Sequence, residues 1–442
     1  MNKSEKIKIN YRIWNKLSDR QKEKIFSRSE ININEIRETV EKIIARVRKY
    51  KDKALVEYAA KFDRADLTGL PLRVQEHEFE EAERSLSPEL RKALEFSIEN
   101  VRRFHVANRP EEHPAIEVCP GITAREKLTP IESAGLYIPR GRGSFPSMLY
   151  MLGVPAVEAG VKRVCVVTPP NPDGTVDAAC LYAAKLCGIN EVYRTGGAQA
   201  IAALAYGTES IEPVVKVVGP GSKYVAAAKR ILYGKIDVGL PAGPSESILL
   251  ADETADPYLA AIDLMVEAEH GSDSSALLVT PSKQTADGVL KHLKKLIPEI
   301  PEPRKTFLKD VLGGYGGIIL TEDMDEACEI VNMFAPEHLE IMTENPSATS
   351  EKIYNAGEIL LGADTPFSAA NYSTGPNAVL PTGGTAKTFS PVSIRDFVKF
   401  SSVIEADRKG YDAVAPHVET IADYEGFITH GNAFKLRKLY KA

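Results

Sequence analysis

The segment VKRVCVVTPP, residues 161–170, decides the fold class, because a run of apolar and β-branched residues ends there in two prolines. Such a run is typical of a buried strand followed by a turn. Helical and strand-like segments alternate after it: DAACLYAAKLCGI (177–189), EVYRTG (191–196), GAQAIAALAYG (197–207), VVKVVGPGS (214–222), KYVAAAKRILYG (223–234) and SESILLAD (245–252). This alternation predicts parallel βαβ units.

A second set of strand-like segments lies further along the chain, with helical segments between its members: SALLVTPS (275–282), GGIILTED (316–323) and EILLG (358–362). The chain has 442 residues, which is too many for one hydrophobic core. We therefore expect two α/β units in one chain.

The segments that flank these units have a different character. Residues 30–108 read as helices, with Asn34 as a candidate N-cap and a second helix after Ser87–Pro88. Their apolar stripes indicate scaffold or subunit packing. The tail from about residue 383 is too short to bury a core of its own. We expect it to pack on another unit or on a partner subunit.

Composition excludes several classes of protein. A net charge of −6 provides no basic field for nucleic acid or for an anionic membrane. No apolar stretch approaches the roughly 20 residues that cross a bilayer, and the polar start lacks the apolar core of a secretory signal. The five cysteines contain no Cys-x-x-Cys pair, which favours a reducing compartment. We expect a cytoplasmic protein.

Three glycine-rich segments, RTGGAQA, VVGPGSKY and LPAGPSES, are expected to follow predicted strands. Helix N-termini and bare backbone N–H groups attract anions at the carboxyl ends of parallel strands. None of the three has the spacing G-x-G-x-x-G, so the usual dinucleotide motif is absent. Each could be a tight structural turn, whereas three in succession favour a bound phosphate or cofactor.

The segment MVEAEHGSD (265–273) places Glu267 and His270 three residues apart near the end of a predicted helix. This spacing puts a carboxylate and an imidazole on one helical face, where they could share a metal. A surface charge pair at a helix C-terminus is the alternative.

The segment NMFAPEHLEI (332–341) joins Glu337 and His338, which we expect at a helix start. An adjacent acid and base suit a two-step proton transfer, although such pairs are also common on surfaces. His430 reads on its own as an exposed tail histidine. The remaining histidines are interpreted as structural: His77, His105, His113, His292 and His417.

Motifs along nearly the whole chain resemble those of histidinol dehydrogenases, in the same order. They are YIPRGRGSFPS, GGAQAIAALAYGTE, GPGSKYV, AGPSE, ADETADP, EAEH, FAPEHLE, TGPNAVLPTGGTA and EGFITH. FAPEHLE and GGAQAIAALAYGTE are the most specific of them. The resemblance implies oxidation of a primary alcohol, L-histidinol, to L-histidine in two NAD-dependent steps through a bound aldehyde. Zinc is expected to hold the substrate rather than to act in redox.

The resemblance also implies an α/β fold of two incomplete Rossmann-like domains with parallel sheets, in a homodimer whose tail completes the partner's active site. Residues 1–30 would form an N-terminal extension. Residues 31–135 and 247–382 would form the first domain, with the metal and catalytic residues. Residues 136–246 would form the second domain, with the NAD contacts, and residues 383–442 the tail.

Carried over by position, the resemblance assigns roles to individual residues. The zinc ligands fall on Glu267, His270, Asn371 and His430. His338 matches the base that takes the alcohol proton and also contacts substrate, and Glu337 matches the group that activates water for attack on the aldehyde. The NAD contacts fall on Tyr137, Gln199 and Ser222, and the substrate contacts on Ser245 and Glu425.

Several residues depart from the family pattern. The family usually has Gln at Glu267 and Asp at Asn371, so the two changes exchange an amide and a carboxylate and conserve the total charge of the metal site. Ala378 replaces a histidine and Ser222 an asparagine. Arg140 replaces a glycine and Arg395 an aromatic residue. Each arginine could be solvated, or could meet an anionic group of the substrate or of NAD.

Three hypotheses follow. The first is histidinol oxidation. The second, motivated by the departures, is a related dehydrogenase for another small alcohol such as 2,3-dihydroxypropane-1-sulfonate. The third is a metal- or nucleotide-binding homologue without catalysis.

Overall fold

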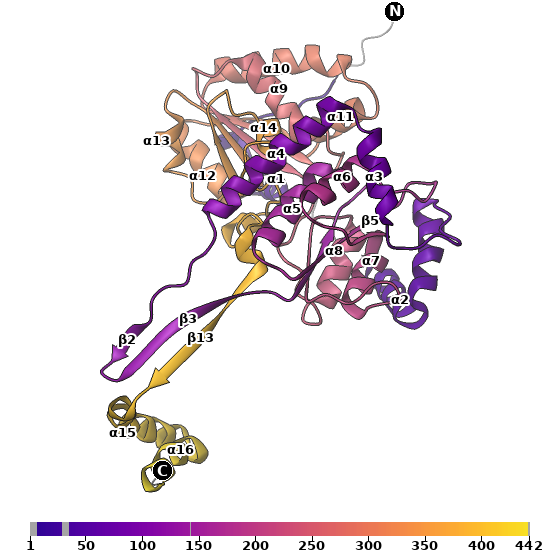
Figure 1. Ribbon diagram of the computed structural model, residues 1–442. Coiled ribbons are helices and arrows are strands. Elements are labelled where there is room, and N and C mark those ends of the chain that lie inside the picture. Colours follow the sequence, from indigo (N-terminus) through magenta and orange to yellow (C-terminus); the bar gives the residue numbers. More distant parts are fainter. Residues whose placement is uncertain (1–6, 29–34, 142, 441–442) are drawn as a thin grey trace, which may run out of the picture. The chain divides into compact units, whose positions relative to one another are not determined.

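The computed structural model describes residues 7–28, 35–141 and 143–440. Two compact units divide the chain: Met1–Asn108 with Glu132–Phe397, and Arg109–Ile131 with Val398–Ala442. The first unit holds two parallel sheets, one of six strands and one of four, covered by helices, which confirms the predicted α/β class (Figure 1). No helix among the described residues is both long and apolar enough to cross a membrane.

The six-stranded sheet has the order β1-β10-β9-β8-β11-β12. Its strands are β1 (Tyr11–Ile13), β8 (Glu246–Ala251), β9 (Ser275–Thr280), β10 (Gly317–Leu320), β11 (His338–Met342) and β12 (Glu358–Leu361). All residues of β8, β9 and β11 are buried, as expected for strands covered on both faces. One face packs on α9 (Pro257–Ala268), α10 (Lys283–Leu296) and α11 (Arg304–Gly313), and the other on α12 (Met324–Phe334).

The four-stranded sheet has the order β6-β5-β4-β7. Its strands are β4 (Ser133–Tyr137), β5 (Arg163–Thr168), β6 (Val192–Arg194) and β7 (Lys216–Val218). Residues of α2 (Arg37–Tyr58), α7 (Gly197–Tyr206) and α8 (Lys223–Leu232) share one core with this sheet. The helix α5 (Pro146–Glu158) contacts β4 and β5 and packs on α4 (Pro88–Ala107) and α6 (Ala178–Leu186). The domain boundaries given above stay a prediction.

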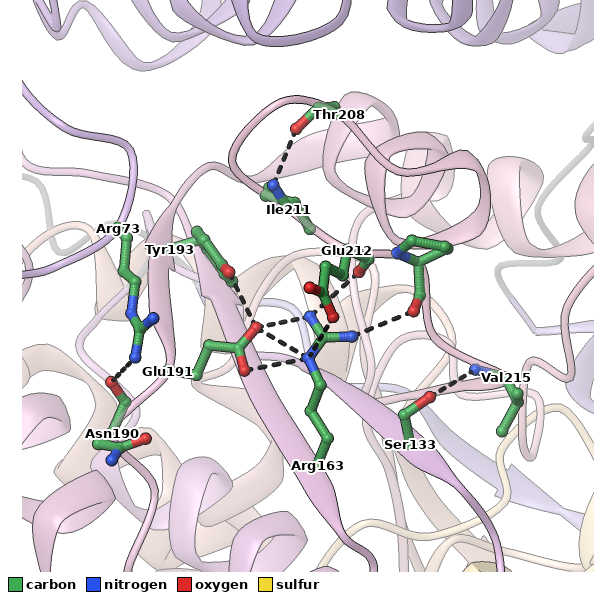
Figure 2. Close-up of polar contacts among 11 residues, drawn as sticks. Arg73, Ser133, Arg163, Asn190, Glu191, Tyr193, Thr208, Ile211, Glu212 and Val215 are labelled. Carbon is green, nitrogen blue, oxygen red and sulfur yellow. Dashed lines mark hydrogen bonds and ion pairs between the residues drawn. The ribbon is translucent and has the colours of Figure 1, made fainter.

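Arg163 ties three segments of this sheet together at the amino-terminal end of β5 (Figure 2). Its guanidinium donates to both carboxylate oxygens of Glu191, just before β6, and to the carbonyls of Glu212 and Pro213, before β7. The hydroxyl of Tyr193 donates to the same Glu191 carboxylate at 2.8 Å. This network fixes the strand starts on the side opposite the glycine-rich turns.

Shorter elements complete the first unit: the helices α1 (Asp19–Ser27), α3 (Glu76–Ser85), α13 (Pro346–Ser350) and α14 (Phe367–Tyr372), and the single turns η1 (Trp14–Lys16), η3 (Ala59–Asp63), η4 (Ile297–Glu299), η5 (Thr385–Lys387) and η6 (Ile394–Phe397). The helix α4 follows Ser87, as the sequence predicted, and the Ser87 hydroxyl caps it by accepting from Leu90 N–H. The predicted cap Asn34 lies outside the described residues.

Two local predictions were wrong. His338 begins the strand β11 rather than a helix, and Glu337 precedes it. The left-handed conformation of Ala335 (φ 51°) ends α12, and Pro336, which has no backbone N–H to donate, cannot continue the helix. In addition, LPAGPSES precedes β8 instead of following a strand, whereas RTGGAQA and VVGPGSKY do follow β6 and β7.

The second unit is an antiparallel sheet with two helices (Figure 1). The hairpin of β2 (Ile116–Cys119) and β3 (Ile122–Pro130) pairs with β13 (Val398–Ala406), and α15 (Arg408–Glu425) and α16 (Ile428–Leu439) follow. The tail is therefore held by pairing with a hairpin some 270 residues earlier in the chain. The first unit extends to Phe397.

Candidate active site

The predicted catalytic pair and three predicted metal ligands meet at the amino-terminal edge of the six-stranded sheet. Here β11 and β12 begin with His338 and Glu358, which are paired in register. A helix in a parallel βαβ unit runs back towards the start of the next strand, so α9 carries Glu267 in its last turn to the same edge. Asp256 caps the start of α9 by accepting from Tyr258 N–H at 2.7 Å.

Glu267, His270 and Asn371 lie together. The Glu267 side chain is 1% exposed, and its Oε2 lies 3.3 Å from His270 Nδ1. Asn371, on α14, donates its side-chain N–H to Glu267 Oε1 at 2.7 Å. Burial acts to raise the pKa of Glu267, but the charges of His338 and His270 and this hydrogen bond lower it overall. The group is thus held as a carboxylate.

The end of α14 is held by α5, which packs on the four-stranded sheet, and by α4, which packs on α5. Tyr150 on α5 donates its hydroxyl to the carbonyl of Tyr372 at 2.7 Å. Asn100 on α4 donates its side-chain N–H to the carbonyl of Ser373 at 2.9 Å. These bonds fix the helix end that presents Asn371.

His338 is surrounded by three carboxylates. Its Nδ1 lies 2.5 Å from Glu358 Oε1, and its Nε2 lies 3.7 Å from Glu337 Oε2 and 3.8 Å from Glu267 Oε2. Burial acts to lower the pKa of His338, but these carboxylates raise it overall. Burial raises the pKa of Glu337 well above its usual range, although its Oε2 accepts from Glu246 N–H at 2.9 Å.

This cluster gathers more acidic groups than basic ones. Three carboxyl groups face one imidazole, and the nearby Glu246 carboxylate already pairs with Arg28 at 3.2 Å. Burial and the charge of Glu267 keep a proton on Glu337, and ionising all three groups would be costly without a counter-charge, so the setting favours a bound cation. Imidazole nitrogen and carboxylate oxygen are ligands that zinc accepts, and the Asn371 amide adds an oxygen donor. The donor set fits the metal that the sequence predicted.

The described residues contain no cluster of three or more His, Cys, Asp or Glu side chains arranged as a complete metal site. In the first unit only Glu267 and His270 of the predicted ligands belong to these residue types, and Asn371 does not. The fourth predicted ligand, His430, lies in the second unit.

The sequence interpretation missed Glu358 and Glu246. Both are acidic residues at the first position of a largely apolar strand, EILL and ESILLA. A charged residue that begins such a strand was the available signal. Its meaning depends on the register with β11, which the sequence does not reveal.

The predicted NAD residues lie around the glycine-rich turns at the carboxyl edge of the four-stranded sheet. The buried Tyr137 accepts at its hydroxyl from Gly197 N–H at 3.0 Å. Gln199 is also buried, and its side-chain oxygen has no hydrogen-bond partner among the described residues. Ser222 is exposed at the N-cap of α8. Gly197 takes a φ of 64°, a conformation that L side chains rarely adopt, so this turn favours glycine.

A cavity of about 1210 Å³ extends beside these turns within the first unit. It is lined by Gly219 and Gly221 after β7, and by Gly243, Pro244 and Glu246 before and at the start of β8. The predicted substrate residue Ser245 lies in this last segment and is partly buried. Glu246 lines the cavity, and its backbone N–H donates to the Glu337 carboxyl group, so the cavity reaches a direct neighbour of Glu337.

The remaining candidates are on the surface. Glu425 and His430 are exposed on either side of Gly426, the residue between α15 and α16 that takes a φ of 76°. Arg140 is exposed and donates to the carbonyl of Pro170 at 3.1 Å. Arg395 is exposed and lines the cavity.

Comparison with known proteins agrees with the motifs and the geometry. A family model described as histidinol dehydrogenase matches residues 26–438. The chain is 48% identical to the histidinol dehydrogenase of Synechocystis over 422 residues, covering 96% of this chain and 97% of that protein. It is also 48% identical to a histidinol dehydrogenase homolog of Rhizobium meliloti over 426 residues, covering 96% of this chain and 93% of that protein.

Among solved structures, histidinol dehydrogenase from Elizabethkingia anophelis matches with a TM-score of 0.91 and 33% identity, covering 97% of this chain and 98% of that one. The chain belongs to the histidinol dehydrogenase family, whose members are NAD-dependent oxidoreductases that act on an alcohol.

Proposed function

We propose that this protein oxidises L-histidinol to L-histidine through a bound aldehyde, with two molecules of NAD. The observation that carries the proposal is the buried cluster in which Nε2 of His338 faces both Glu337 and Glu267 at 3.7–3.8 Å. It unites a base, a second proton acceptor and a metal-ligand candidate within reach of one small substrate.

In the first step, His338 takes the hydroxyl proton of the alcohol. In the second, Glu337 takes a proton from the water that adds to the aldehyde carbon. NAD, when bound, would supply the hydride acceptor for each of the two oxidations. The overall reaction converts the alcohol, water and two NAD⁺ into the carboxylate, two NADH and three protons, so atoms and charge balance.

Zinc is proposed to bind Glu267, His270 and Asn371 of one subunit together with His430 of another. The metal, when bound, supplies a positive charge that fixes the substrate.

The residues proposed to contact NAD are Tyr137, Gln199 and Ser222, because they surround turns at helix N-termini whose N–H groups suit a phosphate. Ser245 and Glu425 are proposed to contact substrate. In this scheme the domain formed by residues 31–135 and 247–382 provides the metal ligands and catalytic residues, and the domain formed by residues 136–246 provides the NAD contacts.

The tail is proposed to complete the site of a second subunit in a homodimer. Large apolar side chains around its metal-ligand candidate are widely exposed within this chain: Tyr424, Phe427, Ile428, Leu436, Leu439 and Tyr440. Apolar surface of this extent is typical of a protein interface. The free state of all five cysteines supports a cytoplasmic location.

The decisive experiment follows NADH formation by the zinc-loaded protein. With L-histidinol we expect two NADH for each alcohol consumed, and L-histidine as product. 2,3-Dihydroxypropane-1-sulfonate serves as the competing alcohol, because Ala378 stands where the family has a histidine. A higher kcat/KM on that alcohol would replace the proposal with the related-dehydrogenase hypothesis. No turnover on any alcohol would favour a homologue without catalysis.

A further inference from the structure

Glu358 and His338 are paired across two adjacent strands. They are the first residues of β12 and β11 and lie opposite each other in the parallel register. Glu358 Oε1 lies 2.5 Å from His338 Nδ1, and the two side chains are 9% and 4% exposed. This is the shortest of the three distances between the imidazole and these carboxylates.

The contact is not needed to hold the strands together. The backbone N–H of Glu358 already donates to the carbonyl of Glu337 at 3.0 Å, and the ladder continues to the pair Ile341 and Leu361. The carboxylate is therefore available to act on the imidazole.

An ionised carboxylate only accepts hydrogen bonds, so the bond requires a proton on Nδ1 of His338. In the neutral ring the lone pair then lies on Nε2, which faces Glu337 and Glu267. The ring of Phe367, edge-on at 6.0 Å between centroids, limits rotation of the imidazole. In hydrolases, a buried carboxylate orients a catalytic histidine in the same way, by accepting a hydrogen bond from its Nδ1–H.

We propose that Glu358 is a positioning residue for His338: it holds the proton on Nδ1 and thereby directs the basic Nε2 towards the substrate. This inference rests on the proposed role of His338 as the base. It assigns Glu358 no contact with substrate, cofactor or metal.

The test compares Glu358→Gln with wild type and with Glu351→Gln, an exposed residue in the connection between β11 and β12. A glutamine amide can turn its NH₂ towards Nδ1 and so stabilise the wrong tautomer. We expect kcat for histidinol oxidation to fall by about 100-fold or more, with the KM for NAD unchanged. Glu351→Gln should keep the wild-type kcat. An unchanged kcat in Glu358→Gln would overturn the proposal.

Two further readouts separate positioning from a general structural effect. In the background of His338→Ala, Glu358→Gln should cause no additional loss, because Glu358 acts only through that ring. An equal loss in that background would overturn the proposal. Proton NMR should show a strongly deshielded Nδ1–H signal that is absent from His338→Ala and shifted upfield in Glu358→Gln. Its persistence in Glu358→Gln would also contradict the assignment.

The NMR signal does not depend on turnover. A wild-type protein that shows the signal but oxidises no alcohol would refute the proposed function and leave the hydrogen-bond assignment standing. A protein that oxidises histidinol but lacks the signal would refute the hydrogen-bond assignment and leave the proposed function standing.

Discussion

Asn371 donates its side-chain N–H to the carboxylate of Glu267 at 2.7 Å, so two of the residues that depart from the family pattern are direct partners. The family resemblance predicts the opposite arrangement, with an amide at position 267 and a carboxylate at 371. An amide can donate to a carboxylate in either arrangement, so the exchange conserves the charge of the pair and is compatible with the same bond.

This partnership predicts that the two positions are coupled. Glu267→Gln should weaken zinc binding by at least about 100-fold, because it removes the only carboxylate among the predicted ligands. The double variant Glu267→Gln with Asn371→Asp should restore zinc binding to near the wild-type level. Zinc competition with a chelator measures both affinities. Additive losses in the double variant would contradict the coupling.

The two catalytic candidates are expected to fail at different steps. His338→Ala should slow alcohol oxidation by about 10²- to 10⁴-fold, because the hydroxyl proton loses its acceptor. Glu337→Gln should still release the first NADH but should stall at the aldehyde. The measurement is the number of NADH formed for each histidinol consumed, expected to be near one in Glu337→Gln instead of two. Two NADH from that variant would exclude Glu337 as the group that activates water.

The parallel strands could be predicted because strands buried on both faces have continuous apolar runs. The segment at 161–170 and its successors have such runs, and the structure has strands there. The strand β11 was missed because HLEIM carries His338 and Glu340 at alternate positions and follows a proline. The proposed role as a base explains His338, whereas Glu340 pairs with the Asp263 carboxyl group.

The pairing of Glu358 with His338 could not be predicted for a different reason. The two residues are 20 positions apart, and their contact depends on which strands are neighbours in the sheet. Local patterns carry no such information. The same limit applies to β13, whose partner β3 lies far away in the sequence.

Complementation tests the role of the tail. If His430 serves a partner's site, mixing His338→Ala with His430→Ala subunits should restore about one quarter of wild-type activity, because half of randomly paired dimers are mixed and each holds one intact site. Each variant alone should be inactive. An inactive mixture whose exchange of subunits is confirmed by mass spectrometry would place His430 in the site of its own chain.

The Arg163 network predicts a stability effect without a catalytic one. Arg163→Met should lower the free energy of unfolding by about 1–3 kcal/mol, because it leaves a partly buried Glu191 carboxylate without its partner. Arg37→Met, which breaks an exposed pair with Glu41, should change it by less than about 0.5 kcal/mol. Urea unfolding measures both variants. Equal effects would show that the network contributes no more than a surface ion pair.

A buried acid pair behind the active site predicts how stability varies with pH. Burial raises the pKa of Glu340 to about 9 and that of Asp263 to about 6, and the charge of Asp263 adds to the shift of Glu340. Neither carboxylate oxygen of Glu340 has a hydrogen-bond donor among the described residues, so a proton held between the two acids satisfies the pair. The folded state then binds more protons than the unfolded chain, and stability must fall as the pH rises through these values.

Glu340→Gln, which mimics the protonated acid, should leave Tm unchanged at pH 5 and raise it at pH 9. Calorimetry at the two pH values measures this difference, with Glu351→Gln as the control. A wild-type Tm that rises from pH 5 to pH 9, together with a lower Tm for Glu340→Gln at pH 9, would mean that Glu340 is ionised in the folded protein.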